Sequence, residues 1–224
     1  MKLQKYGGFA LLASICVYIV FLAYAKPIFL SVKMKDMAEV MAVMSSTASG
    51  KLYVLLLLWL VYLLLGFFVI VALHERMHAD APYLSHVMLM AALASTAIGV
   101  TSIMLDVKGI GNILPAQDLS AFRSCWNIKQ GLKNATDFTF AWCILFAGCA
   151  ILATRSFSRV LGWLAILTGS LLIPVCCFPI QTLQVHSGLR QIYAILIIIM
   201  YLTVSIWLGI ALLRNKQHIP QPMQ

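Results

Sequence analysis

The chain has 224 residues, of which 62% are hydrophobic and only 10% are charged, and its mean hydropathy is +0.94. Soluble domains are roughly 45–50% apolar and about 25% charged, so the composition excludes an ordinary soluble domain and indicates an integral membrane protein. The formal net charge of +9 comes from basic residues that are scattered along the chain without interleaved aromatics. We therefore expect contact with the lipid bilayer and no binding of nucleic acid.

Six apolar runs are long enough to cross a hydrocarbon core of about 30 Å, which takes roughly 20 residues of helix. Because every backbone N–H and C=O group in lipid must be satisfied within its own segment, these runs are expected to be helices. The sequence predicts an all-α fold, a single membrane domain over residues 1–224 that forms a polytopic bundle of six transmembrane helices. The six runs are residues 7–25, 53–73, 87–105, 138–154, 160–178 and 191–213.

The first run has two interpretations. Lys2 and Lys5, the apolar stretch and then Ala23-Tyr24-Ala25 also describe a secretory signal peptide with a small-residue cleavage site. The apolar stretch is longer than is usual for such a peptide, so we expect a retained helix. If it were cleaved, five helices would remain.

Two long connectors, Lys26–Leu52 and Asp106–Asp137, lie on the same side of the predicted bundle. Each is expected to contain an interfacial helix. In the second connector this helix is predicted over Asp118–Lys133, with Asp118 or Ser120 as its N-cap. We expect both connectors to be extracytoplasmic.

Orientation follows from the shorter loops, because Lys and Arg favour the cytoplasmic side of a membrane. If six helices alternate, the basic residues of the amino end, of the tight connector Arg155–Arg159 and of the carboxyl tail fall on one side. The sequence therefore predicts that both termini are cytoplasmic.

Small residues, which let helices approach closely in lipid, are concentrated in the third, fourth and fifth runs. They include Gly99 in the third run, Gly148 in the fourth, and Gly162 and Gly169 in the fifth. These three helices are expected to form the tight centre of the bundle.

Ionisable residues lie outside the six apolar runs or at their edges. Ion-coupled transporters and voltage sensors place such groups at membrane depth, where a charge costs several kcal/mol and persists only for function. The sequence therefore disfavours a proton- or sodium-driven transporter.

Residues 74–78 read His-Glu-Arg-Met-His, an H-E-x-x-H sequence at the end of the second run. On a helix, His74 and His78 share one face and are suited to bind zinc, with Glu75 as general base. A zinc-dependent membrane hydrolase is therefore one alternative function. The other interpretation, which we prefer, is that a polar cluster simply ends the span.

A catalytic zinc needs a third protein ligand. Asp106 resembles the distant Asp of membrane-embedded proteases, but it lies at the far end of the third run, about 30 Å from the motif. The candidates that remain on the motif's side are Asp80, His86 and His218. Because these lie in a short loop, at a helix start and in the tail, we expect no catalytic residue and no bound metal.

A methionine pattern occupies the first connector, where Met34, Met37, Met41 and Met44 repeat at three and four residues and share one helical face. Thioethers suit Cu(I), so a copper-handling membrane protein is a second alternative. The same spacing is typical of the apolar face of an interfacial helix, which we predict over Val32–Met44.

Cys125 lies in the second connector, and Cys176 and Cys177 lie near the same side of the bundle. In an oxidising compartment Cys125 would be able to pair with either of them. The spacing alone does not decide between a disulfide and a free thiol.

Several segments resemble a bacterial family of small six-helix integral membrane proteins that is known only as a domain of unknown function. They are Ala72–Arg76 with Ala81-Pro82 after the second run, Trp142 and Gly148 in the fourth, the connector Arg155–Arg159, and Leu161–Gly169 in the fifth. The resemblance implies a bacterial inner-membrane protein without a zinc pair, and it brings no biochemical role. We therefore expect a non-enzymatic accessory, scaffold or sensor subunit that needs no cofactor and contacts other membrane-protein subunits.

Overall fold

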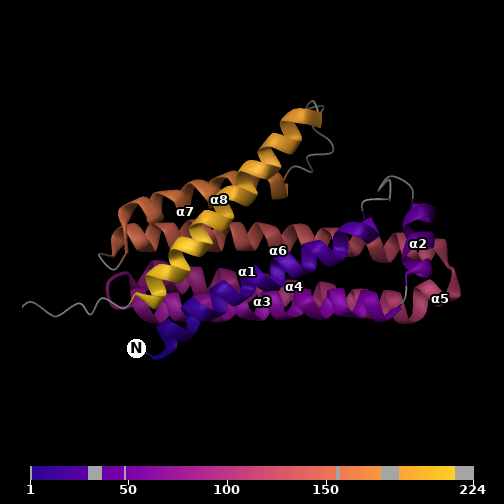
Figure 1. The fold of residues 1–224 in the computed structure, drawn as a ribbon, viewed down its shortest axis with the longest axis horizontal. Helices are drawn as coiled ribbons and strands as arrows, with labels where there is room; N and C mark the ends of the chain where they lie inside the picture. Colours follow the sequence, from indigo (N-terminus) through magenta and orange to yellow (C-terminus); the bar gives the residue numbers. More distant parts are fainter. Residues whose placement is uncertain (1, 30–36, 48, 155–156, 178–186, 215–224) are drawn as a thin grey trace, which may run out of the picture.

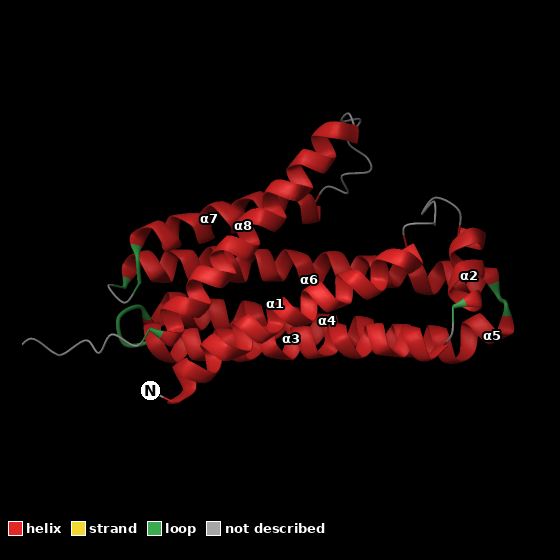
Figure 2. Ribbon diagram, in the orientation of Figure 1, coloured by secondary structure: helices red, strands yellow, loops and turns green. Residues whose placement is uncertain are grey.

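The computed structural model describes residues 2–29, 37–47, 49–154, 157–177 and 187–214, and the regular structure in these ranges is helical throughout (Figures 1 and 2). The elements are α1 (Lys2–Phe29), α2 (Met37–Ser46), α3 (Ser49–Met77), α4 (Pro82–Lys108), a π-helical turn η1 (Gly109–Ile113), α5 (Leu114–Ala116), α6 (Leu119–Ala153), α7 (Arg159–Cys177) and α8 (Ser187–Leu213). The predicted all-α class is confirmed.

Five stretches of the described chain are helical, long enough and apolar enough to cross a membrane. They are Leu3–Ala25, Ser49–Met77, Pro82–Ala116, Leu119–Ala153 and Ile195–Leu213. The protein is therefore a membrane protein with a helical bundle. The run predicted at 160–178 forms α7, whose apolar part, Arg159–Pro174, is shorter than the other five.

The long helices α3, α4 and α6 run side by side along the molecule, α7 lies along α6, and α1 and α8 cross the bundle obliquely (Figure 1). One end holds the start of α1, the turn between α3 and α4 and the last residues of α8, and we call it the hairpin end. The opposite end holds α2, η1, α5 and the start of α6, and we call it the α2 end (Figure 1). An apolar cluster of buried residues lies toward each end.

Close packing of α6 on α7 depends on glycine, as predicted. A Cβ atom at Gly148 would lie 2.8 Å from the Gly162 carbonyl oxygen, and one at Gly169 would lie 2.9 Å from the Ala141 carbonyl oxygen. Neither approach leaves room for a side chain, so larger residues would force the helices apart.

The second connector is shorter than predicted. α4 continues to Lys108 and α6 begins at Leu119. The segment Asp118–Lys133 therefore does not form a separate interfacial helix. It is instead the first half of a helix of 35 residues. The segment contains no proline, and a single glycine, Gly131, costs a helix only about 1 kcal/mol. The N-cap prediction is confirmed, because the Asp118 carboxylate accepts hydrogen bonds from the Ser120 and Ala121 backbone N–H groups.

In the first connector, the described part of the helix predicted over Val32–Met44 is helical and continues to Ser46. Residues 30–36 lie outside the described ranges, and the described helix is α2. Its apolar face packs on protein, because Met41 and Met44 are buried in a cluster with Leu114 and Phe122.

Candidate metal centre

The hairpin between α3 and α4 is fixed by a short turn with a buried interior. Met77 is fully buried, and its carbonyl accepts hydrogen bonds from the backbone N–H groups of Asp80 and Ala81. Pro82 then opens α4, a position that suits proline because the first N–H groups of a helix have no partner within it. The turn therefore places the last turn of α3 beside the first turn of α4.

The side chains of residues 74–78 point to different neighbours of α3. Met77 faces the core, and the Arg76 guanidinium donates a hydrogen bond to the Ala211 carbonyl of α8 at 3.0 Å and lies 4.2 Å from the centre of the Phe157 ring. These contacts attach the end of α3 to α8 and to the segment before α7. His74 and His78, one helical turn apart, occupy the face toward α4.

His86, from the first turn of α4, completes a cluster of three imidazoles with His74 and His78. The ring centres of His74 and His78 are 5.1 Å apart, those of His74 and His86 are 5.0 Å apart, and those of His78 and His86 are 4.8 Å apart. One ligand nitrogen from each residue lies within 4.8 Å of the other two. His74 is half-buried, whereas His78 and His86 are exposed.

Two of the rings are oriented by hydrogen bonds through Nδ1. The Nδ1 of His86 lies 2.7 Å from the Pro82 carbonyl oxygen, and because a carbonyl only accepts, Nδ1 carries the proton. In the neutral ring, Nε2 then has a free lone pair. The Nδ1 of His74 lies 2.8 Å from the hydroxyl of Ser85, which is fully buried. Histidines that bind metals are usually held in this way by their other nitrogen.

The spacing fits a transition metal after a small adjustment. Nitrogen ligands at roughly 2.0–2.1 Å from a tetrahedral zinc lie about 3.4 Å from one another, so nitrogens that lie up to 4.8 Å apart need to converge by up to about 1.4 Å. His78 and His86 are exposed, and His78, whose ring is not held through Nδ1 in the way that His74 and His86 are, would make most of the adjustment. Three imidazoles would leave a fourth position for water or another ligand.

The other residues that the sequence singled out near the motif lie outside the cluster. Glu75 is exposed next to His74, and Asp80 is exposed in the turn. Asp106 is near the end of α4, at the α2 end, where its carboxylate forms an ion pair with Lys129 at 2.8 Å, so it lies away from the three imidazoles. His218 lies outside the described residues.

The remaining candidates show other environments. Met37 is half-buried against the cluster at the α2 end, in which Met41 and Met44 are buried, and Met34 lies outside the described residues. Cys125 carries a free thiol that lies 3.9 Å from the Leu105 carbonyl oxygen, so it forms no disulfide with Cys176. The side chain of Cys177 is not among those that the structure describes.

Comparisons of the chain with family models, with curated proteins and with solved structures find no match. The candidate centre therefore rests on its own geometry. A signal for its third ligand is present in the sequence: His86 follows His78 by eight residues across a proline, and a tight antiparallel turn brings such positions together.

Proposed function

We propose that this chain is a metal-responsive membrane protein that binds one Zn2+ ion through His74, His78 and His86, in an accessory or sensor role. The observation that carries the proposal is the convergence of three imidazoles from two helices. Imidazole nitrogen suits zinc, and the hydrogen bonds at Nδ1 supply the outer support that such ligands need. This replaces the expectation that the motif is only a polar end of a span.

A sensor role is supported by the exposure and the position of the three ligands. Two of them face the surroundings, so zinc would enter and leave without unfolding of the bundle. The ion would link the last turn of α3 to the first turn of α4, and Arg76 joins the same end of α3 to α8. The free energy of zinc binding would therefore favour one arrangement of the ends of α3, α4 and α8 over others.

We also propose that the chain has six spans and that its hairpin end is cytoplasmic. α7 has 19 residues, which at 1.5 Å each give about 28 Å, close to the thickness of a hydrocarbon core, so we take it as a sixth span. The basic residues near the hairpin end, among them Lys5, Arg159 and Arg214, favour a cytoplasmic position for that end. The resemblance described above favours a bacterial inner membrane.

Zinc content of the purified protein tests the proposal. After exposure to zinc and removal of the excess, the protein in mild detergent should hold about one zinc per chain, and His78→Ala should hold much less. Glu75→Gln, at the same helix end but outside the ligand set, is the matched control and should keep its zinc. A protein that binds no zinc, or a His78→Ala variant that binds as well as the parent, would contradict the proposal.

Glu75 favours a second candidate, a zinc-dependent membrane hydrolase. It occupies the position of the general base in an H-E-x-x-H sequence, and three imidazoles with an open fourth position are a ligand set known from catalytic zinc. This candidate predicts zinc-dependent hydrolysis of an activated ester, with a rate that falls by roughly 100-fold or more in Glu75→Gln while zinc stays bound. Equal rates of hydrolysis for the parent protein and Glu75→Gln would eliminate the hydrolase candidate.

A further inference from the structure

The bundle surrounds a cavity of about 620 Å3 whose lining includes none of the three histidines. Its wall is mostly apolar and draws residues from α1, α3, α4, α6, α7 and α8, with Met44 from α2. The volume falls within the roughly 300–1,000 Å3 of sites that bind small molecules. Along α4 the wall extends from Ala92 to Asp106, which is about 21 Å of helix.

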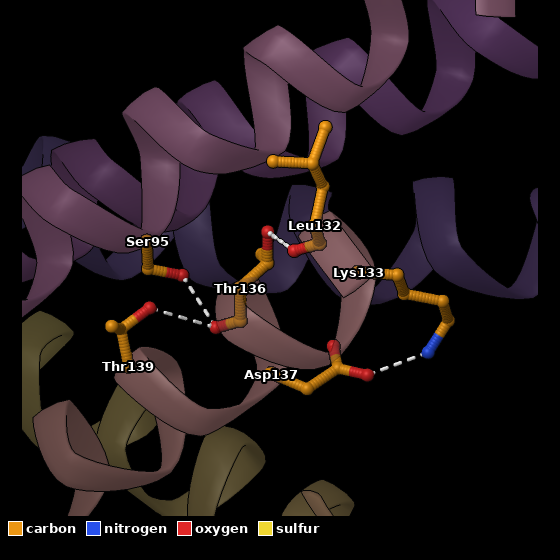
Figure 3. A network of polar contacts seen from close by, with 6 residues as sticks. All are labelled: Ser95, Leu132, Lys133, Thr136, Asp137 and Thr139. Atoms are coloured by element: carbon orange, nitrogen blue, oxygen red, sulfur yellow. Dashed lines mark hydrogen bonds and ion pairs between the residues drawn. The ribbon is translucent and has the colours of Figure 1, made fainter. Parts of the chain in front are cut away.

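Charged side chains line this cavity toward the α2 end. Asp106 and Lys129 form an ion pair at 2.8 Å, with 14% and 23% of their side chains exposed. Lys133 and Asp137 form a second, more exposed pair one helical turn along α6 (Figure 3). Toward the hairpin end, the lining consists of side chains such as Leu73 and Leu208. The cavity is therefore charged toward one end and apolar toward the other.

Hydroxyl groups in the wall are largely engaged with the protein itself. Ser95 donates to the Thr136 carbonyl at 3.1 Å, and Thr136 donates to the Leu132 carbonyl at 2.9 Å (Figure 3). The hydroxyls of Tyr62 and Tyr201 bond to each other at 2.8 Å. A hydrophilic solute in the middle of the cavity would lose its water without gaining these donors, which is costly. A hydrocarbon chain would lose nothing.

The size of the cavity suits one such chain. A methylene group takes up about as much room as a water molecule, roughly 30 Å3 in the liquid, so 620 Å3 corresponds to about twenty methylene groups. Two of the lining residues, Lys133 and Ile198, are exposed, so the space communicates with the surroundings.

We propose that the cavity binds a single-chain amphiphile, with its polar head at the Lys–Asp pairs and its hydrocarbon chain directed toward Leu73 and Leu208. The head gains charge-assisted hydrogen bonds from Lys129 or Lys133, and the chain gains an apolar wall. This inference is independent of the zinc proposal, because the lining of the cavity includes none of the three histidines.

Gly66 offers a direct way to block the chain. It lies on α3 in the wall of the cavity, and a Cβ atom there would meet no heavy atom within 4 Å. Gly66→Phe should therefore fill part of the space without disturbing its neighbours. Gly131→Phe is the matched control, because this exposed glycine of α6 also has open space around its Cβ and does not line the cavity.

The probe is 9,10-dibromostearate, whose bromine atoms quench tryptophan fluorescence. Trp59 lines the cavity and is held by the rings of Phe21 and Tyr62, with ring centres 5.3 and 5.2 Å away, so it is a fixed reporter. A Trp59→Phe protein measured in parallel isolates its signal. Brominated lysophosphatidylcholine in a second titration distinguishes an anionic head from a zwitterionic one.

We expect saturable quenching of Trp59 by at least one probe in the parent protein and in Gly131→Phe. In Gly66→Phe the apparent affinity should fall by about 10-fold or more, with unchanged helix content. Gly66→Leu covers the case in which the phenylalanine variant does not fold, and it should show a smaller loss of affinity in the same direction. Quenching that does not saturate, or that is the same in the Gly66 variants and the control, would overturn the proposal.

Discussion

The histidine cluster at the hairpin end and the methionine face of α2 begin from the same kind of pattern. Each places side chains that are able to bind metals one helical turn apart, His74 and His78 in one case, Met37, Met41 and Met44 in the other. In the structure the two patterns diverge. The histidines meet a third imidazole from the next helix and two of the three are exposed, whereas Met41 and Met44 are buried among apolar side chains.

The difference shows that a helical repeat of potential ligands does not by itself predict a metal site. A helical spacing fixes which side chains share a face, but a metal site also needs a further ligand from another element and a path to the solvent. The hairpin supplies both at His86. At α2 the neighbouring elements supply Leu114 and Phe122 instead, so the thioethers serve as flexible packing groups.

The largest effect in this comparison is expected at Met41. Met41→Ala should lower the free energy of unfolding by about 2–5 kcal/mol, because it removes a buried side chain and leaves a cavity. Met41→Leu keeps the volume and should cost less than about 1.5 kcal/mol. Denaturant or thermal unfolding in detergent checks this, with zinc content measured alongside. A Met41→Ala protein as stable as its parent would contradict the packing role.

Ser85 tests the histidine cluster at the hairpin end. Ser85→Ala should weaken zinc binding by about 10- to 100-fold, because the His74 ring loses the hydroxyl that orients its Nδ1. Competition with a coloured chelator measures the affinity. Ser95→Ala, which removes another buried hydroxyl of α4 far from the cluster, is the control and should bind zinc like the parent. If both variants bind equally well, the orienting role of Ser85 is wrong.

A smaller effect is expected at Asp118, which caps α6 near the methionine face. Asp118→Ala should lower the stability by about 0.5–2 kcal/mol, because the Ser120 and Ala121 N–H groups lose their acceptor. Asp118→Asn, which keeps an acceptor, should restore most of the loss. Unfolding curves of the three proteins decide the matter, and a loss in Asp118→Asn equal to that in Asp118→Ala would contradict the capping role.

The sequence predicted those features that depend on one segment at a time. Five of the six apolar runs lie in long helices that are able to span a membrane, the Asp118 cap forms as expected, and Gly148, Gly162 and Gly169 bring α6 and α7 together. The features it did not predict depend on contacts between segments. The continuation of α6 through Lys129 is accompanied by an ion pair with Asp106 on another helix.

The candidate site shows the same limit. The pattern of His74 and His78 is visible in the sequence, and His86 is among the residues that the sequence places on the same side. The distance of His86 from His74 and His78 depends on how tightly the chain turns between Met77 and Pro82. That turn is set by the burial of Met77 and by the two hydrogen bonds that its carbonyl accepts. Spacing along the chain does not contain that information.

X-ray absorption at the zinc edge of the purified, zinc-loaded protein tests the central claim most directly. The account predicts a shell of nitrogen and oxygen atoms at roughly 2.0–2.1 Å, with the outer scattering of three imidazole rings. In His86→Ala that scattering should fall to two rings or the zinc should be lost. Sulfur neighbours at about 2.3 Å, or a His86→Ala spectrum identical to that of the parent, would contradict a zinc site built from the α3–α4 hairpin.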